Sequence, residues 1–516
     1  MMDLFNNLAL GFSVVNQIVW YDILGVSIPV PINIVLCLIG ALVGTLVGVL
    51  PGVGPLATIA MLLPITFGLP PVGALIMLAG IFYGAQYGGS TTSILVNIPG
   101  EASSVVTTLD GHQMAKQGRA GPALAIAAIG SFIAGCVSTV FVAALGVPLT
   151  GLALKFGPAE YFTLMVLGLV FAVVLAKGSV PKAITMILFG LLLSMVGSDL
   201  ETGASRMAFN IPELADGVGF VTVAMGVFGI AEIIRNLEGT HDRTVVNTKI
   251  TGLMPTAKDL KDCAGPITRG TILGSILGIL PGGGATIAAF AAYTFEKKMS
   301  KTPQIFGRGA IQGVAAPESA NNAAAQTSFI PLLTLGIPPN AVMALMIGAM
   351  TIHGIVPGPQ VMTKQPDLFW GMIASMWIGN VMLLVINLPL VGLWVRLLRV
   401  PYRMLYPAIL IFCCIGLYSL NSAPADVMMA AAFGLIGYWL IKHDFEPAPM
   451  LLGFVLGPLM EENLRRAMLI QRGDWTVFFS RPISGTLLVL ALILLIVSVL
   501  PMIRKQREVV FVEGEN

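Results

Sequence analysis

Long runs of apolar residues, separated by short polar segments, recur along the whole chain. A membrane-spanning helix needs about 20 consecutive residues that are mainly apolar. In the first half, such runs predict membrane helices at residues 31–50, 70–87, 120–147, 158–176, 178–198 and 215–235. In the second half, they predict membrane helices at residues 266–281, 340–357, 368–395, 404–420, 424–441 and 482–503. The pattern therefore predicts an all-α polytopic membrane protein with about 12 spans.

Several other apolar stretches are too short or too interrupted to cross a bilayer. These stretches are residues 55–67, 89–99, 284–295, 325–339 and 448–460. We interpret them as discontinuous helices or re-entrant hairpins. Irregular backbone at membrane depth is tolerated only where it is buried in protein or lines a water-filled cavity. The short stretches are therefore where we expect a binding site.

The first 29 residues follow a different pattern. Apolar residues recur at helical spacing from Leu4 to Val19, and Trp20 and Tyr21 follow them. No basic residue precedes this stretch, so it does not have the form of a cleaved signal peptide. The pattern predicts that residues 1–29 form an amphipathic helix in the membrane interface.

The two halves of the chain share a repeated segment. Residues 40–54 (GALVGTLVGVLPGVG) and 270–284 (GTILGSILGILPGGG) are identical at seven of fifteen positions, at an offset of 230. A weaker match, at an offset of 239, relates residues 93–100 (SILVNIPG) to 332–339 (LLTLGIPP). Interrupted hydrophobic segments in corresponding places of two halves are typical of secondary transporters. We expect a first transmembrane repeat at 30–235, a polar cytoplasmic linker at 236–265, a second transmembrane repeat at 266–481, and a last span with a cytoplasmic tail at 482–516.

Each repeated segment ends in a loop of proline and glycine. Pro51 and Pro281 lack an amide hydrogen and disfavour helix at the preceding residue, and the glycines permit left-handed backbone angles. Such a loop leaves unpaired carbonyls on one side and unpaired N–H groups on the other. N–H ends attract carboxylates, and carbonyl ends can coordinate sodium. We therefore expect substrate contacts at Pro51, Gly52, Gly54, Pro281, Gly282, Gly283 and Gly284, with sodium near Gly52 and Gly282.

Two polar clusters interrupt otherwise apolar surroundings. The first contains Ser90, Thr91, Thr92, Ser93, Asn97 and Glu101, and the second contains Glu318, Asn321 and Asn322, with Thr334 further along. Hydroxyl and amide groups donate to carboxylates and offer oxygen atoms to sodium, and neither cluster contains Lys or Arg. We expect these residues to line the substrate site. The ion-coupling candidates are Glu101, Glu318, Asn97 and Asn322, and the two asparagines are also candidate sodium ligands.

A purely structural interpretation of the same residues stays open. Ser, Thr and Asn side chains can cap helices or form hydrogen bonds between them. Glu101 and Glu318 can equally lie at the membrane interface as carboxylates in the first turn of a helix. The glycines at every fourth position of the repeated segment favour close helix packing.

Composition agrees with a membrane protein and excludes other classes. Only 10% of the 516 residues are charged and 56% are hydrophobic, whereas about 25% of a soluble domain is charged. The net charge of +2 gives no indication of a nucleic-acid partner. Arg504, Lys505 and Arg507 follow the last span, and the positive-inside rule places them in the cytoplasm. The acidic loop 199–216 is expected on the outer side.

Metal, nucleotide and enzyme chemistry have little support. The five cysteines form no C-x-x-C pair and the four histidines are widely separated, so no zinc site is expected. Residues 52–57 fit the pattern G-x-G-x-x-A, but they follow an apolar helix and not a strand. No phosphate-binding loop, nucleophile elbow or nucleophile–base pair is present, so we expect neither enzymatic activity nor an organic cofactor.

Several motifs resemble the large membrane subunit of the tripartite tricarboxylate transporters, the TctA family. They are the two GxLPGxG-type loops, YGGSTTSILVNIPGE (residues 87–101 with Tyr87 first), LDGHQMAKQGRAG (109–121), PESANNAAAQ (317–326) and LTLGIPPN (333–340). The resemblance covers nearly the whole chain. It implies a bacterial inner-membrane permease that works with a small membrane subunit, TctB, and a periplasmic solute-binding protein, TctC.

The resemblance also implies a function. The family imports citrate and other carboxylates with an ion gradient and not with ATP. We therefore expect an ion-gradient-driven secondary importer, with sodium or a proton as the coupling ion. A carboxylate-selective channel and a scaffold subunit of a transport complex are the alternatives. The segments 110–121 and 353–359 are expected to serve packing or partner contact and not ligand binding.

Overall fold

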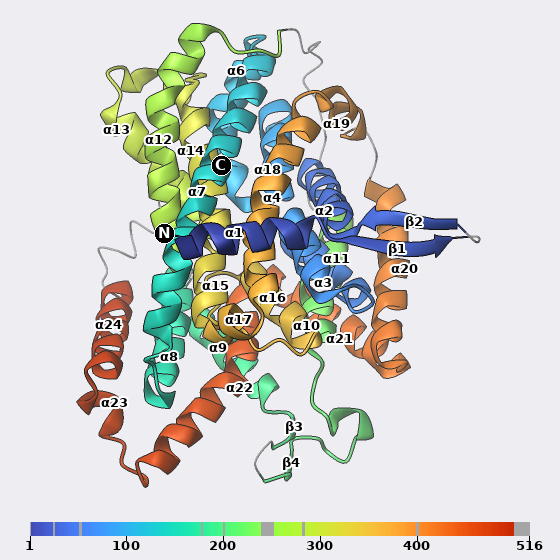
Figure 1. The fold of residues 1–516 in the computed structure, drawn as a ribbon, viewed down its shortest axis with the longest axis vertical. Helices are drawn as coiled ribbons and strands as arrows, with labels where there is room; N and C mark the ends of the chain where they lie inside the picture. Colours follow the sequence, from blue (N-terminus) through green and yellow to red (C-terminus); the bar gives the residue numbers. More distant parts are fainter. Residues whose placement is uncertain are drawn as a thin grey trace.

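The computed structural model describes residues 2–23, 26–50, 54–176, 179–199, 202–238, 252–280, 284–398 and 402–499, and most of these residues are helical (Figure 1). The first part contains α1 (Met2–Val15), α2 (Ile32–Val49), α3 (Pro55–Thr66), α4 (Pro71–Val96), η1 (Ala102–Ser104), α5 (Val105–Thr107), η2 (Thr108–His112), α6 (Gln113–Lys116), α7 (Ala120–Ala153), α8 (Pro158–Leu175), α9 (Val180–Ser194), η3 (Pro212–Leu214), α10 (Phe220–Ala224), η4 (Met225–Ile230) and α11 (Ala231–Glu238). The second part contains α12 (Ala257–Ile279), α13 (Gly284–Met299), η5 (Pro303–Ile305), α14 (Gln312–Thr327), α15 (Phe329–Leu335), α16 (Ala341–Ile352), α17 (Pro359–Lys364), α18 (Pro366–Asn387), α19 (Val391–Leu397), α20 (Tyr402–Asn421), α21 (Pro424–Lys442), α22 (Pro447–Ile470), α23 (Val477–Ser480) and α24 (Pro482–Val499).

Six of the described helical segments are long and apolar enough to cross a membrane. They are α2, α4, α7, the continuous segment Phe220–Glu238, α18 and α21. Shorter apolar helices, including α3, α8, α9 and α16, accompany them. The prediction of a helical, multi-pass membrane protein is therefore confirmed. The total of about 12 spans stays a prediction.

The N-terminal helix is shorter than the sequence pattern indicates. Helix α1 ends at Val15, and the chain then forms an antiparallel hairpin of β1 (Ile18–Ile23) and β2 (Val26–Pro31). β-branched and aromatic residues such as Val19 and Trp20 favour a strand over a helix, which explains the early end of the helix. Helix α1 lies across α18, where Phe12 stacks on Trp377 with ring centroids 6.1 Å apart (Figure 1). A second, two-residue ladder joins β3 (Gly197–Ser198) to β4 (Ser205–Arg206).

The glycine stripe of the first repeated segment lets α2 lie directly on the backbone of α4. A Cβ atom added at Gly40, Gly44 or Gly48 would lie 2.2, 2.5 or 2.3 Å from a carbonyl oxygen of α4. No real side chain tolerates such distances. The stripe therefore serves close helix packing, as the sequence pattern indicates.

The second repeated segment makes the same kind of contact between α12 and α14. A Cβ atom at Gly270, Gly274 or Gly278 would lie 2.3, 2.2 or 2.5 Å from a carbonyl oxygen of α14. The weaker sequence match also has a structural counterpart. Asn97, after α4, and Gly336, after α15, both adopt left-handed backbone angles, with φ of 60° and 72°.

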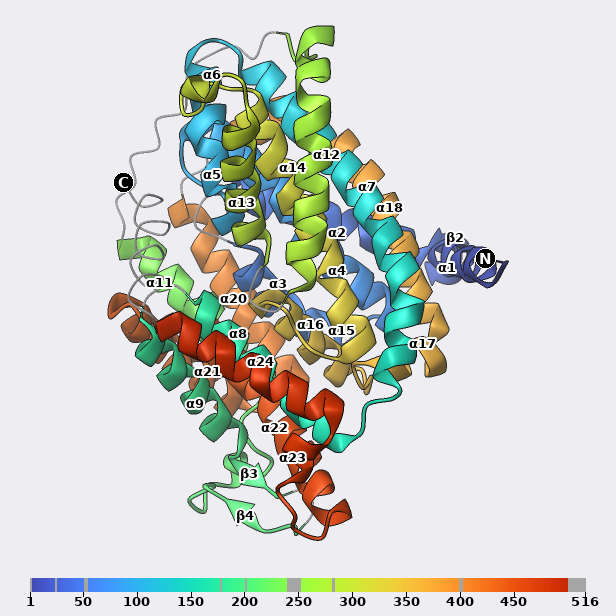
Figure 2. The ribbon, with the colours of Figure 1, turned by 90° about the vertical axis from the view of Figure 1, so that its left-hand side faces the viewer.

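Two long helices, α7 and α18, each pack against the glycine-striped helix pair of the other half of the chain. Helix α7 of the first half packs against α12 and α14, whereas α18 of the second half packs against α2 and α4. Helices α7 and α18 also contact each other, and Figure 2 shows them running side by side along one face. The interior between the four paired helices is therefore built from both halves of the chain.

The structure corrects the predicted bounds of three short apolar stretches. Residues 70–87 and 89–99 were expected as a span and a separate short segment, but α4 runs unbroken from Pro71 to Val96. Gly88 and Gly89 do not break α4, because they admit the backbone of α2 and the side chain of Glu101. Helix α22 likewise extends well beyond the predicted segment 448–460. Conversely, the expected segment 325–339 is divided between α14 and α15.

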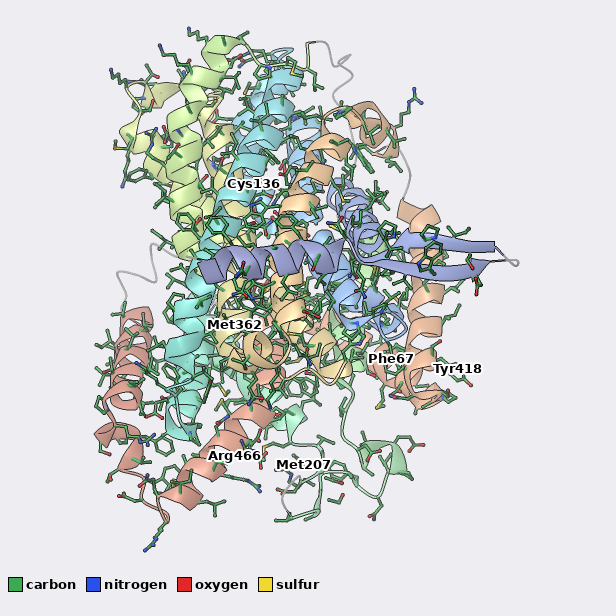
Figure 3. The ribbon with its side chains drawn as sticks, viewed as in Figure 1. Phe67, Cys136, Met207, Met362, Tyr418 and Arg466 are labelled. Atoms are coloured by element: carbon green, nitrogen blue, oxygen red, sulfur yellow. The ribbon has the colours of Figure 1, made fainter. Side chains whose placement is uncertain are left out.

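The two ends of the molecule carry different elements. Helices α6, α12 and α13 form one end, and α23, β3 and β4 lie at the other (Figures 1 and 2). Figure 3 places Met207 and Arg466 at this second end. There Arg465 donates to the Asp199 carboxylate at 2.6 Å and holds the outer part of α22 against the β3–β4 loop.

Candidate substrate and ion site

The centre of the candidate site is Glu318, in the middle of α14. Helix α14 is rich in alanine and is buried from Gly313 to Thr327, because small side chains allow α4, α7, α12 and α13 to approach it. Glu318 has no exposed surface. One carboxylate oxygen accepts a hydrogen bond from the Ser90 hydroxyl of α4 at 2.5 Å, and the other accepts from the Thr107 hydroxyl of α5. Glu318 is therefore not a first-turn carboxylate at the interface, but a buried acid between the two halves.

Glu101 lies beside the same helix, at the start of η1. Its carboxylate accepts a hydrogen bond from the Asn321 amide at 3.3 Å, and its backbone N–H donates to the Ser104 hydroxyl at 3.3 Å. Ser93 donates to the same hydroxyl at 2.9 Å. A Cβ atom at Gly89 would lie 2.9 Å from the Glu101 side chain, so a larger residue there would displace Glu101. Asn321, one turn along α14 from Glu318, thus brings Glu101 to the same helix.

Buried amides extend the polar stripe along α14. The Asn322 amide donates to the Ser131 hydroxyl of α7 at 2.7 Å and to the Glu318 carbonyl at 3.1 Å. The side-chain oxygens of Asn321 and Asn322 and both polar atoms of the Gln326 side chain are buried without a hydrogen-bond partner. Folded proteins contain few such atoms, and a bound ion or water is a common reason for them. These unpaired polar atoms are therefore available to bind a ligand.

A small cavity adjoins this stripe. Its polar lining consists of Tyr87, Ser90 and Thr91 from α4, Ser131 from α7 and Asn387 from α18, and its apolar lining is Leu124, Ala127 and Ala128. Ser90 and Ser131 thus connect the cavity to Glu318 and Asn322. The cavity has room for about one water-sized sphere.

Only part of the loops that end the repeated segments lies within the described residues. Pro51, Gly52, Pro281, Gly282 and Gly283 lie outside the described residues, and their role stays a prediction. Gly54 precedes α3 and Gly284 begins α13. The Thr92 hydroxyl donates to the Val49 carbonyl at 2.7 Å and so ties the end of α2 to the polar part of α4.

Two predicted site residues have other contacts. Asn97 is exposed and ends α4 in a left-handed conformation, which asparagine tolerates better than most residues. The Thr334 hydroxyl donates to the Ile330 carbonyl at 2.7 Å within its own helix. No described hydrogen bond connects Asn97 or Thr334 to the carboxylate cluster.

Sequence reasoning missed Thr107, Ser131 and Asn387. Ser131 and Asn387 are isolated polar residues within long apolar runs, and a buried polar residue at membrane depth is a functional candidate by default. That signal could have identified both residues. Thr107 gave no such signal, because only the tertiary contact with Glu318 distinguishes it from its neighbours.

Asp110 explains the motif at residues 109–121. One oxygen of its buried carboxylate accepts hydrogen bonds from the N–H groups of Gly307, Gly309 and Ala310 at 2.8–2.9 Å. The other accepts from the Tyr293 hydroxyl at 3.0 Å. Asp110 therefore anchors the loop between α13 and α14 to η2, which agrees with the expectation of a packing role.

Comparisons with known proteins identify the family of this chain. The chain is 58% identical over 515 residues to an uncharacterized 52.8 kDa protein from the TAR-I ttuC' 3' region of Agrobacterium vitis, with full coverage of both chains. It is 62% identical over 242 residues to an uncharacterized protein from the TAR-II ttuC' 3' region of the same organism, which covers 47% of this chain and all of that protein. No solved structure matches the chain. The model of the tripartite tricarboxylate transporter TctA family matches residues 34–452, so this chain belongs to the TctA family, membrane components of tripartite tricarboxylate transporters.

Proposed function

We propose that the chain is the permease of a three-part carboxylate importer and that it is driven by an ion gradient, with sodium as the coupling ion. In this proposal it lies in the bacterial inner membrane, works with a small subunit of the TctB kind, and receives substrate from a periplasmic binding protein of the TctC kind. Membership of the TctA family supports this class. Citrate is the first substrate to test.

The observation that carries the proposal is the pair of carboxylates on α14 and η1. Glu318 is fully buried and Glu101 is linked to the same helix through Asn321. In the described part of the chain, every ion pair involves other carboxylates. A buried carboxylate without a cationic partner is costly, and an anionic substrate nearby would be repelled.

A bound cation removes both difficulties. It compensates the charge of Glu318 and weakens the repulsion that a carboxylate substrate would feel. Cation and substrate then each increase the affinity for the other, as reciprocal coupling between sites requires. This is the physical reason for assigning ion-coupled transport and not passive flow.

The substrate is proposed to bind between the Pro51 and Pro281 loops and the two polar clusters. The polar residues of this region come from helices of both halves: Ser90, Thr92 and Ser93 from α4, and Asn322 from α14. A ligand bound among them would therefore change its contacts when one half moves against the other. One part of the protein would then move relative to the rest and open the site to the cytoplasm.

The test is uptake of labelled citrate by vesicles that contain this chain and its small partner. An inward sodium gradient is applied with and without the binding protein. Accumulation that requires both supports the proposal, and Glu318→Gln should reduce the initial rate about tenfold or more. Glu462→Gln serves as the control and should transport normally, because Glu462 is a half-buried residue of α22 that pairs with Arg466.

The alternatives give different results in the same assay. A channel equilibrates citrate without concentrating it against a gradient. A scaffold subunit assembles normally and transports equally well after Glu318→Gln. If assembled vesicles accumulate no citrate under a sodium gradient but accumulate it under a proton gradient, the choice of sodium is wrong.

A further inference from the structure

We propose that a single sodium ion binds in the small cavity between α4, α7 and α18, with Ser90, Ser131 and Asn387 among its ligands. This inference rests on the proposed function and gives the coupling ion a location. The location differs from the sodium positions that the sequence suggested, which are Gly52, Gly282, Asn97 and Asn322. Asn387 and Ser131 come instead from helices outside the repeated segments.

Asn387 is the first support for this site. It is buried in the last turn of α18, and its amide nitrogen donates to the Leu383 carbonyl at 2.9 Å and to the Thr45 hydroxyl at 3.3 Å. These two bonds fix the orientation of the amide. Its oxygen atom is buried, has no hydrogen-bond partner and belongs to a residue that lines the cavity. An amide oxygen in this position lacks a donor or a cation.

The two serines supply the second support. The Ser131 hydroxyl accepts a hydrogen bond from the Asn322 amide and retains a further lone pair. The Ser90 hydroxyl donates a hydrogen bond to the Glu318 carboxylate, so the lone pairs of its oxygen can coordinate a cation. A cation in the cavity is thus separated from the Glu318 carboxylate by one hydroxyl group, which allows charge compensation without direct contact.

The chemistry of the lining selects the kind of ion. All five polar side chains of the cavity offer neutral oxygen atoms, and the space admits about one water-sized sphere. The described residues contain no group of three or more His, Cys, Asp or Glu placed to hold a metal ion. Transition metals prefer nitrogen and sulfur ligands, and divalent cations need more carboxylates. Neutral oxygens beside a single carboxylate suit a small monovalent cation such as sodium.

The position of the ion would link the two halves of the molecule. Its ligands come from α4 and α7 of the first half and α18 of the second, and Glu318 and Asn322 support them from α14. Occupancy would therefore stabilise one arrangement of these crossing helices. The coupling ion would therefore bind at the contact between α4, α7 and α18, which would have to rearrange when one half moves against the other.

The experiment measures binding of radioactive sodium-22 to the purified full-length chain in lipid nanodiscs, with choline replacing unlabelled sodium to hold the ionic strength. Ser131→Ala and Asn387→Ala each remove one ligand oxygen and should raise the half-saturating sodium concentration about tenfold or more. Ser138→Ala is the matched control. Ser138 is also a buried serine of α7, but it bonds to Ser275 at 3.0 Å and does not line the cavity.

The outcomes separate this site from the proposed function. Unchanged sodium binding in both variants, or no saturable binding by the wild-type chain, overturns the site. Sodium-driven citrate uptake that persists in both variants also overturns the site and leaves the importer proposal intact. Weakened binding in the folded variants, in a wild-type protein that accumulates no carboxylate, supports the site and contradicts the importer proposal. Thermal unfolding without sodium identifies a variant that is misfolded. In that case Asn387→Asp tests the site, because a carboxylate at this position should lower the half-saturating sodium concentration.

Discussion

The Ser90 hydroxyl of α4 donates a hydrogen bond of 2.5 Å to the Glu318 carboxylate of α14, and so joins two residues that are 228 positions apart in the chain. This bond crosses from one glycine-striped helix pair to the other. It connects the cavity between α4, α7 and α18 to the buried acid at the centre of the candidate site. Most of the expected chemistry depends on this contact.

Replacement of Ser90 by alanine should weaken both stability and transport. The change leaves one oxygen of a fully buried carboxylate without a donor, which costs about 1–3 kcal/mol. We expect a lower unfolding temperature and slower sodium-driven uptake. The control is Ser194→Ala, since the Ser194 hydroxyl bonds only within its own helix, at 2.7 Å to the Leu191 carbonyl. Equal unfolding temperatures and uptake rates for S90A and wild type would contradict the assigned contact.

The two glycine stripes should be equally intolerant of alanine. A methyl group at Gly44 or Gly274 would lie 2.5 or 2.2 Å from a carbonyl oxygen of the facing helix and would force the paired helices apart. We expect both Gly44→Ala and Gly274→Ala to destabilise the protein by about 1–3 kcal/mol. Gly151→Ala in α7 meets no atom within 4 Å and should be neutral or stabilising by up to about 1 kcal/mol. Thermal unfolding in detergent measures all three variants.

Asp110 should act as a structural anchor. Asp110→Ala removes the acceptor of three backbone N–H groups and of the Tyr293 hydroxyl, and hydrogen bonds to a charged group contribute about 1.5–3 kcal/mol each. We expect marked destabilisation and faster proteolysis between α13 and α14. Tyr293→Phe removes a single bond and should have a much smaller effect. Wild-type resistance to proteolysis in D110A would show that the anchor is dispensable.

Asn97 offers a test of conformation against ligand binding. Its φ of 60° suits glycine better than alanine, which costs about 1–2 kcal/mol in this conformation. If the side chain serves only to end α4, Asn97→Gly should transport normally and Asn97→Ala should be less stable. If the side chain binds substrate or sodium, as the sequence predicts, both variants should lose uptake. Initial rates of citrate uptake together with unfolding temperatures distinguish the two roles.

The two ends of the molecule should lie on opposite sides of the membrane. Exposed Lys261 lies near the start of α12. Exposed Arg466 lies on α22 at the opposite end of the molecule, where Figure 3 labels it. With Cys136 and Cys414 replaced by alanine, we expect Arg466→Cys to react with a membrane-impermeant maleimide in cells with a permeable outer membrane. Lys261→Cys should react only after the inner membrane is opened. Labelling of both from the same side would contradict the predicted topology.

Much of the architecture was decided by the local sequence. Uninterrupted apolar runs specify helices such as α2 and α7, because their side chains favour the bilayer and their backbones must satisfy every hydrogen bond internally. The glycine spacing at Gly40, Gly44 and Gly48 also determined the close packing of α2. A helix face made of glycines has no side chains to pack, so it is most stable in direct contact with the backbone of another helix.

Tertiary structure alone decided the continuity of helices and the composition of the site. Gly88 and Gly89 suggest a break by their local preference, yet α4 stays helical because the glycines admit α2 and Glu101 and because burial enforces backbone hydrogen bonding. The partnership of Ser90 with Glu318 and the presence of Asn387 at the same cavity come from helices far apart in sequence. Residue types indicated which groups could bind an ion, but only the crossing of α4, α7, α14 and α18 determined which of them meet.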